Sequence, residues 1–197
     1  MNALPTKKTK DLINTAEAFV KEAFAKNPHF SFNDGSVMHN HSLIVKELSL
    51  EIAEDVPGCD IEVLAIAALL HDIGKTYPAD EETLHYSHED LNLTVSKEYI
   101  SKLQIDEAKK KKIEEIISYK SDSLELKIIK DADTIALYKD KKLYMLFIEW
   151  ASASNLDASI QRKLDKFDRL SFSKSKEIAL PLLIEMKEDW ARYLRKK

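Results

Sequence analysis

Hydrophobic positions recur at intervals of three and four residues along most of the chain, as they do on one face of an α-helix. The stretch from Thr9 to Lys26 shows this pattern, and so does the stretch from about Ser36 to Asp55. The same spacing predicts further helices over residues 87–102, 108–119, 124–138, 143–153, 158–167 and 173–194. No run of alternating apolar and polar residues is long enough to require a β-strand. The pattern therefore predicts an all-α fold.

The stretch from Ile61 to Lys75, IEVLAIAALLHDIGK, is apolar on nearly every side over its front half. A helix of this kind lies in the middle of a fold rather than on its surface. Its end delivers His71 and Asp72 into the interior, and Gly74 is expected to take the left-handed conformation that ends a helix. A buried carboxylate costs several kcal/mol unless it is paired or coordinated. The sequence therefore predicts a divalent cation here, with further ligands from elsewhere in the chain.

Turn and capping residues separate the predicted helices. Asn33-Asp34-Gly35 and Pro57-Gly58 mark loops, and Asp60 is placed to cap the apolar central helix. Residues 76–84 are predicted to form a polar loop, after which Ser87 caps the next helix. The lysine run at 109–112 is expected to be a solvated face, with contact to an anionic partner as the alternative.

Two acidic residues, Asp131 and Asp133, interrupt the apolar face of their predicted helix. Packing does not explain them, because neither should be buried without a partner. Packing also leaves unexplained His41, near a helix start, and the pair His71-Asp72. A site of imidazole and carboxylate ligands with open coordination positions suits Mn, Fe, Co, Ni or Zn, and its carboxylates could also bind Mg. The sequence does not choose among these ions.

The composition favours a single domain over residues 1–197. With 197 residues and 44% hydrophobic content the chain can bury one sizeable core, and 3 Gly and 5 Pro are too few for a visible linker. A net charge of −4 argues against a protein that coats nucleic acid. The lone Cys59 excludes an internal disulfide framework and fits a reducing compartment. Since no apolar run suits a signal peptide or a membrane span, we expect a cytoplasmic protein with no membrane partner.

The order of these residues resembles the H…HD…D signature of the HD-domain metal-dependent phosphohydrolases. The matching segments are His41 followed by Val45, then ALLHDIGK, then KDADTIAL, and the resemblance covers roughly Val37 to Tyr138. It implies a helical HD core at about 37–138 with a C-terminal helical extension at about 140–197. It also implies one divalent metal ion, held by His41, His71, Asp72 and Asp133.

Two neighbours of these ligands have roles that the resemblance leaves open. Asp131 would support a ligand or cap a helix, because in similar motifs the second Asp of D-A-D is the ligand. His39 competes with His41 for the first ligand position, but the spacing to Val45 favours His41. The alternative for His39 is an exposed turn residue.

The segment that begins with His88 and Glu89 resembles a His-Glu pair that, in some HD proteins, holds a second metal ion or contacts the substrate phosphate. A further His would then be expected near the end of the following helix, where this chain has Ser118-Tyr119-Lys120. This departure favours a single ion, with His88 contacting phosphate or acting as a general acid. His85 could bind the substrate in the same way. The alternative for both is a solvated position at a loop or helix start.

The resemblance also implies roles in hydrolysis of a phosphoester or phosphoanhydride bond. Asp72 would ligate the ion and orient the attacking water, and His88 would protonate the leaving oxygen. Lys75 would pair with the substrate phosphate as a point charge. The alternative for Lys75 is a cation that complements the C-terminus of the central helix, and both roles are compatible.

We therefore expect a hydrolase that acts on a nucleotide or another small phosphorylated metabolite, as a phosphatase or a pyrophosphohydrolase. The alternative is a non-catalytic HD domain that binds metal and nucleotide as a sensor or interaction module. A di-iron HD oxygenase would need more histidines than can be placed. No catalytic residue is evident in the final third, where Pro181 should kink the last helix or mark its start. The aromatic helix Leu143 to Ala153 either supports a homo-oligomer or belongs to the core.

Overall fold

The computed structural model of the chain describes residues 6–27, 35–150 and 156–195, apart from the side chains of Glu81, His85, Tyr86, Trp150 and 156–159. The described part is all-α and contains no β-strand, as the sequence predicted. Its α-helices are α1 (Lys7–Lys26), α2 (Gly35–Ala53), α3 (Ile61–Leu70), α4 (Glu81–Lys102), α5 (Glu107–Ile117), α6 (Leu124–Lys139), α7 (Lys141–Trp150), α8 (Leu156–Leu164) and α9 (Ser173–Leu194). Two short 3₁₀ helices, η1 (Ile73–Thr76) and η2 (Phe167–Arg169), complete the described elements.

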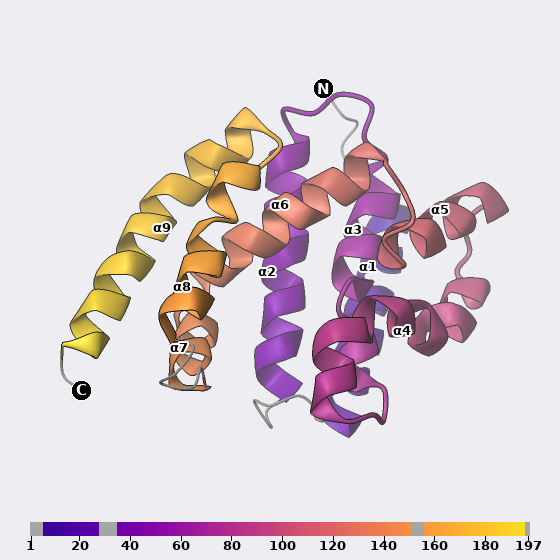
Figure 1. Cartoon of the computed structure of the whole chain (residues 1–197). Coiled ribbons are helices and arrows are strands. Elements are labelled where there is room, and N and C mark those ends of the chain that lie inside the picture. Colours follow the sequence, from indigo (N-terminus) through magenta and orange to yellow (C-terminus); the bar gives the residue numbers. More distant parts are fainter. Residues whose placement is uncertain (1–5, 28–34, 151–155, 196–197) are drawn as a thin grey trace.

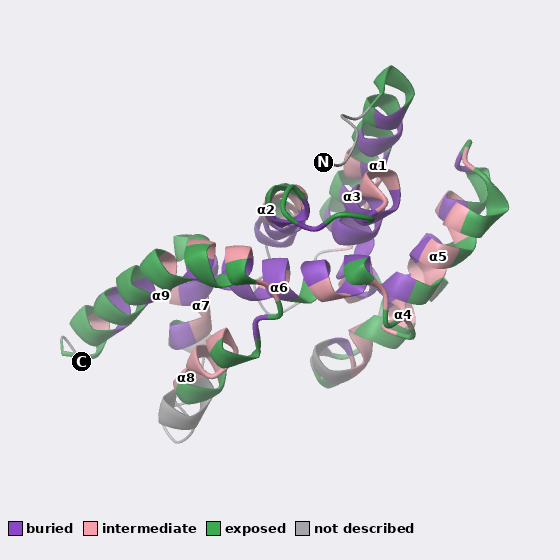
Figure 2. Ribbon diagram, turned by 90° about the horizontal axis from the view of Figure 1, so that it is seen from above, coloured by how far each residue is buried: buried purple, intermediate pink, exposed green. Residues whose placement is uncertain are grey.

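Helices α2 and α6 cross in the middle of the molecule and pack on each other (Figure 1). On one side α2 packs on α1 and α3, while α4 and α5 cover the far side of α3 and η1. On the other side α6 packs on α9, and α7 fills the space between α6 and α9. Buried residues concentrate on α2, α3 and α6, and exposed residues on the outward sides of α5 and α9 (Figure 2).

The central helix α3 is buried as its apolar sequence predicted. Every residue from Val63 to Leu70 has no exposed surface. Asp60 caps its start, because the side-chain carboxylate accepts hydrogen bonds from the backbone N–H groups of Glu62 and Val63. The helix ends at Leu70, so the next two residues, His71 and Asp72, enter the interior with 2% and 3% of their surface exposed.

Gly74 does not adopt the left-handed conformation expected of it, and that prediction is wrong. Among the described glycines only Gly58 has a positive φ, of 87°. Gly74 instead lies in η1 against α4, where a Cβ atom would stand 2.1 Å from the backbone oxygen of His88. A glycine is required because only a residue without a side chain lets the turn after α3 approach α4 so closely.

Helix α4 begins earlier than predicted, so the assignment of Ser87 as its cap is wrong. The cap is Asp80, whose carboxylate accepts a hydrogen bond of 2.9 Å from the backbone N–H of Thr83. The first turns of α4 are polar except for the fully buried Leu84, which gives the sequence almost no apolar periodicity there. His88 therefore lies inside the helix rather than at its start.

Helix α9 runs without interruption through Pro181, so this proline does not mark its start. Ser173 begins the helix, and its inner face carries Leu183, Met186 and Trp190 in the core. The indole N–H of Trp190 donates to the backbone oxygen of Tyr144 at 3.2 Å, which ties α9 to α7.

The aromatic helix α7 is largely a core element. Tyr144 and Ile148 are 2% and 0% exposed, and the Tyr144 hydroxyl donates to the carboxylate of Asp189 at 2.6 Å. A homo-oligomer built on this helix stays a prediction, although these side chains are already occupied by contacts with α9.

The lysine run on α5 is only partly the solvated face that the sequence predicted. Lys109 reaches Asp60, the cap of α3, at 3.2 Å and Glu62 in the first turn of α3 at 3.0 Å. Lys112 reaches the buried Glu125 on α6 at 2.9 Å. These ion pairs lie across helix contacts and fix α5 against the core. The Lys111 side chain is 77% exposed, and within the described ranges its ion pair is with Glu115 of its own helix.

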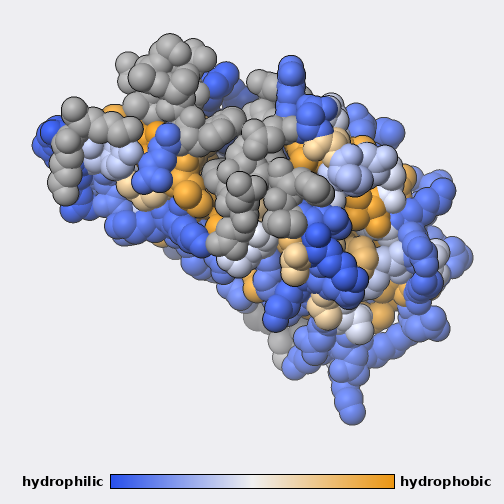
Figure 3. Space-filling view, turned by 90° about the horizontal axis from the view of Figure 1, so that it is seen from below, coloured by the Kyte–Doolittle hydropathy of each residue, from blue (hydrophilic) through white to orange (hydrophobic). Residues whose placement is uncertain are grey.

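No helix in the described ranges is long and apolar enough to cross a membrane. On the face drawn in Figure 3 hydrophilic side chains cover most of the described surface, and apolar side chains gather only in separate small patches.

Candidate metal centre

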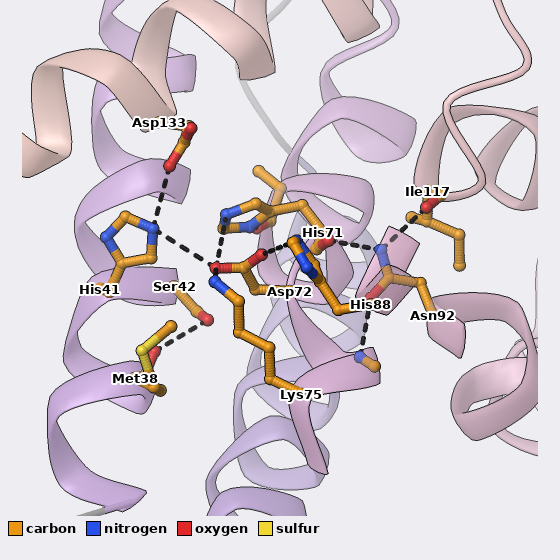
Figure 4. A network of polar contacts seen from close by, with 12 residues as sticks. Met38, His41, Ser42, His71, Asp72, Lys75, His88, Asn92, Ile117 and Asp133 are labelled. Carbon is orange, nitrogen blue, oxygen red and sulfur yellow. Dashed lines mark hydrogen bonds and ion pairs between the residues drawn. The ribbon is translucent and has the colours of Figure 1, made fainter. Parts of the chain in front are cut away.

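The first candidate ligand, His41, lies on the buried side of α2. It is 3% exposed, and Val45 and Leu48, one and two turns further on, are buried with it. Its Nε2 atom lies 3.2 Å from Oδ1 of Asp133 and 3.7 Å from Oδ2 of Asp72 (Figure 4). The competing His39 is not in this group. Its charged neighbours are Lys21 and Glu17 of α1, and burial lowers its pKa.

The second candidate ligand, His71, has one ring nitrogen fixed and the other unpaired. Its Nδ1 lies 2.7 Å from the backbone oxygen of Ala68, so Nδ1 carries the proton and Nε2 presents a lone pair. No hydrogen-bond donor of the described chain reaches this buried Nε2 atom. Burial lowers the pKa of His71 in spite of the nearby charge of Asp72, which favours the neutral, ligating form.

Asp133 brings α6 to the same point. The ligand atoms of His41, His71 and Asp133 all lie within 4.8 Å of one another. Partial burial alone would raise the pKa of Asp133, but the Lys166 ammonium, 3.4 Å away, and the hydrogen bond to His41 hold it well below its usual value. Asp133 is therefore an anion at neutral pH.

Asp72 lies in the middle of the site, among His41, His71, His88 and Lys75 (Figure 4). Its Oδ2 is 2.6 Å from Nζ of Lys75 and 3.5 Å from Nε2 of His71, and its Oδ1 is 3.1 Å from Nε2 of His88. Burial would raise the pKa of Asp72, but the Lys75 charge, with smaller contributions from the two histidines, holds it well below the ordinary range. The carboxylate is thus ionised and only 5% exposed.

These donors suit a divalent metal ion. The lone pair of His71 Nε2 faces Oδ2 of Asp72 at 3.5 Å, and two such acceptors repel each other unless a cation or a proton lies between them. Two imidazoles and two carboxylates from α2, α6 and the turn after α3 converge there, which is a donor set for Mn, Fe, Co, Ni or Zn and, through the carboxylates, Mg. The hydrogen bond from His71 to Ala68 is the outer support that metal-bound histidines usually have.

A cavity of about 810 Å³ opens over this group of residues. The candidate ligands His41, Asp72 and Asp133 line its floor, and residues of α7, α8 and η2 line the opposite wall. Its described cationic lining consists of Lys75, Lys127, Lys130, Lys163, Lys166 and Arg169. Lys163, Lys166 and Arg169 come from the final third of the chain, where no catalytic residue was evident from the sequence.

Comparison with known families identifies this arrangement. The profile of the HD domain matches residues 38–170. The chain belongs to the HD domain family. A crystal structure of an HD-superfamily hydrolase from Bacillus thuringiensis has the same fold, with a TM-score of 0.68 at 18% identity over 95% of this chain and 97% of that chain. A search of curated proteins found no match.

The match to the HD domain reaches beyond Tyr138, where the resemblance seen in the sequence ended, and takes in the cavity wall as far as residue 170. The short linear motif H…HD…D could not indicate this wall. The lysines of this wall occur among many others in the chain, and what distinguishes them is the contact of Lys163 with Tyr138 and of Lys166 with Asp133.

Asn92 is a buried residue of the HD domain that the sequence analysis missed. Its amide group donates to the backbone oxygens of His71 and Ile117, and its Oδ1 accepts from the backbone N–H of Gly74 at 2.7 Å. Because it contacts both ends of the His71–Gly74 turn, Asn92 holds this turn against α4. An Asn at a core position of a helix, among apolar neighbours, was the available signal.

Tyr119 occupies the segment where a further histidine was sought. It has a φ of 56°, unusual for a residue other than glycine, and its ring lines the cavity with Nζ of Lys130 5.4 Å from the ring centre. Burial raises the pKa of Tyr119 well above its usual value, and the charges of Asp133 and Asp72 add to this effect. The tyrosine is therefore a neutral wall of the cavity. The side chain of His85, another predicted substrate contact, lies outside the described residues.

Asp131 caps the chain segment directly before α9, in agreement with helix capping, one of its two expected roles. Its carboxylate accepts hydrogen bonds from the backbone N–H groups of Ser171, at 2.9 and 3.0 Å, and Phe172, at 3.1 Å. These are the residues directly before α9. The two acids of the D-A-D sequence thus serve different parts of the molecule, Asp131 the segment before α9 and Asp133 the candidate metal centre.

This division predicts opposite results for two alanine variants. Asp131→Ala should lower the free energy of unfolding by about 1–3 kcal/mol, because the backbone N–H groups of Ser171 and Phe172 lose a charged acceptor that is itself buried, and should leave ion binding intact. Asp133→Ala should lose ion binding and change the unfolding free energy less. Chemical denaturation and metal analysis of the two proteins test this, and loss of the ion from Asp131→Ala alone would contradict the assignment.

Proposed function

We propose that the protein is a metal-dependent phosphohydrolase that cleaves a phosphoester or phosphoanhydride bond of a nucleotide or another small phosphorylated metabolite. The observation that carries this proposal is the unpaired Nε2 of His71, which faces two carboxylates at the floor of a cationic cavity. The HD domain match and the hydrolase with the same fold support the choice of hydrolysis over sensing.

His41, His71, Asp72 and Asp133 would hold the divalent ion. A bound ion supplies two effects in such sites: it lowers the pKa of a water molecule, and it neutralises charge on a phosphoryl oxygen. The ring of His71 is oriented by Ala68, so its contribution is preorganised. We favour one ion over two because Tyr119, rather than a histidine, stands at the cavity wall.

Lys75 and His88 would act on the substrate side of Asp72. Lys75 lies 2.6 Å from Asp72, so its charge stands beside the candidate ligands, where it would pair with a phosphoryl oxygen. His88 has an acceptor at each ring nitrogen, the backbone oxygen of Leu84 at 3.0 Å and Oδ1 of Asp72 at 3.1 Å. Such a ring satisfies both contacts when it is doubly protonated, which is the form that can give a proton to a leaving oxygen.

Lys75→Met should separate ion binding from turnover. The variant keeps the length of the side chain but not its charge, so we expect it to retain the ion and to lose about 100-fold in kcat/KM, since a charged hydrogen bond to a phosphoryl group is worth about 1.5–3 kcal/mol. Lys97→Met, an exposed position on α4, is the matched control. Unchanged turnover in Lys75→Met would contradict a contact with the substrate phosphate and would mean that Lys75 serves as an ion-pair partner of Asp72.

The decisive experiment measures phosphate and pyrophosphate release. The protein is stripped of metal and supplied in turn with Mn, Mg, Co, Ni or Zn, and a panel of nucleoside mono-, di- and triphosphates and sugar phosphates is offered, with Asp72→Ala beside it. Metal-dependent release that Asp72→Ala lacks supports the proposal, and the product distinguishes a phosphatase from a pyrophosphohydrolase. Stoichiometric ion binding without release from any member of the panel would instead favour a sensor.

A further inference from the structure

The cations of the cavity fall into two groups. Lys75 and Lys166 each contact a candidate ligand carboxylate, at 2.6 and 3.4 Å, and Lys127 contacts Asp122 at 2.9 Å. The remaining three have no carboxylate within ion-pair distance anywhere in the described part of the chain. These three, which we call the distal cations, are Lys130, Lys163 and Arg169.

Lys163 is the best defined of the distal cations. It is partly buried, with Nζ 4.8 Å from the centre of the Phe147 ring, and the backbone oxygen of Lys163 accepts a hydrogen bond of 2.9 Å from the buried Tyr138 hydroxyl. Burial lowers the pKa of Lys163 to about 8, and the neighbouring charge of Lys166 adds to this effect. The ammonium group of Lys163 has lost part of its hydration and has no carboxylate within ion-pair distance in the described chain, so a bound anion would stabilise its charged form.

The charge of the cavity exceeds what one phosphoryl group can neutralise. Six cationic side chains and four carboxylates line it, so two positive charges are in excess before any ion is bound, and a divalent ion would double that excess. A phosphomonoester carries only about −1.5 to −2 at neutral pH. The volume of about 810 Å³ is also in the range of cavities that hold a whole metabolite rather than one phosphate.

We infer that the distal cations form a second anion subsite, and that the substrate carries a second phosphoryl group besides the one cleaved at the metal centre. This inference rests on the proposed function for the position of the cleaved group. The second group would be bound by Lys163 inside the cavity and by Arg169 and Lys130 at its rim, where both side chains are exposed. Arg169 offers the planar pair of N–H donors that suits a phosphoryl group.

The test compares ligands with one and two phosphonate groups. Alkane bisphosphonates with one to four carbons and the matching alkylphosphonates are titrated calorimetrically into the protein, with the same excess of divalent ion throughout. The native protein should bind at least one bisphosphonate about tenfold more tightly than its monophosphonate, which is the size of one charged hydrogen bond. Lys163→Met, which keeps the apolar stem over Phe147, and Arg169→Met should each lose most of that preference.

Two controls keep the result specific. Lys187→Met removes an exposed lysine on α9, outside the cavity, and should retain the preference. Methylphosphonate should bind Lys163→Met as tightly as it binds the native protein, because the metal centre is untouched. A native protein with no preference for any bisphosphonate, or a preference that survives in both Lys163→Met and Arg169→Met, would overturn the inference.

The binding test can fail independently of the proposed function. Phosphate release from the substrate panel without any bisphosphonate preference would contradict the second subsite and support the proposed hydrolase. A preference that depends on Lys163 and Arg169, with no turnover of any substrate, would support the second subsite and contradict the proposed hydrolase function.

Discussion

His71→Ala is expected to abolish stoichiometric ion binding and reduce phosphate release to background. The substitution removes His71 Nε2, a buried ring nitrogen that no donor of the described chain satisfies, while the carboxylates of Asp72 and Asp133 remain. Loss of an outer support of a metal ligand already costs about 10–100-fold in affinity, and loss of the ligand should cost at least as much. Metal analysis after dialysis and phosphate-release assays measure both effects.

The matched control for this variant is His39→Ala. His39 lies two residues before His41 on the same helix but has Lys21 and Glu17 as its charged neighbours. It should keep the ion and the activity, and circular dichroism of both variants should show the native helix content. Full occupancy of the ion in His71→Ala would mean that the centre described above does not bind it.

Among the substitutions that add one methyl group near the site, Gly74→Ala is expected to be the most destabilising. The new Cβ would lie 2.1 Å from the backbone oxygen of His88 and 2.9 Å from Oδ1 of Asn92, so α4 or the turn after α3 must move. Overpacking of this kind costs typically about 1–3 kcal/mol, and a clash with backbone rather than with a flexible side chain belongs at or above the upper end. The displaced turn carries Asp72, so ion affinity should fall with stability.

Gly58→Ala separates this clash from the general cost of replacing glycine. Gly58 has a φ of 87°, and nothing lies within 4 Å of a Cβ placed there, so the variant should lose only about 1 kcal/mol through backbone strain and should bind the ion normally. Denaturation curves and ion titrations for both variants test the comparison. Equal destabilisation of the two would show that the contact between Gly74 and α4 is not tight.

The sequence predicted most clearly those features that depend on local pattern. The apolar run before His71 located the buried central helix, and the cap Asp60 marked its start. The placement of His41, His71 and Asp133 within 4.8 Å agrees with the ligand set that the resemblance implied. Their role as ligands stays a prediction until an ion is measured.

The features that the sequence did not reveal depend on contacts between distant elements. The start of α4 was missed because its first turns are polar apart from Leu84, so Asp80 looked like a loop residue. The conformation of Gly74 was misjudged because the need for glycine comes from α4 rather than from its own backbone. Lys163 and Arg169 were missed because no linear spacing relates α8 and η2 to a centre formed by α2, α3 and α6.

Helix α6 joins the two halves of the molecule through a pair of acids on opposite sides. Asp131 and Asp133 are two residues apart, which on an α-helix is a rotation of about 200°. One carboxylate therefore points to the segment before α9 and the other to the metal centre. Inserting a single residue early in α6 would rotate both acids by about 100° and misdirect both at once, so the length of this helix should be far less tolerant of change than that of any surface loop.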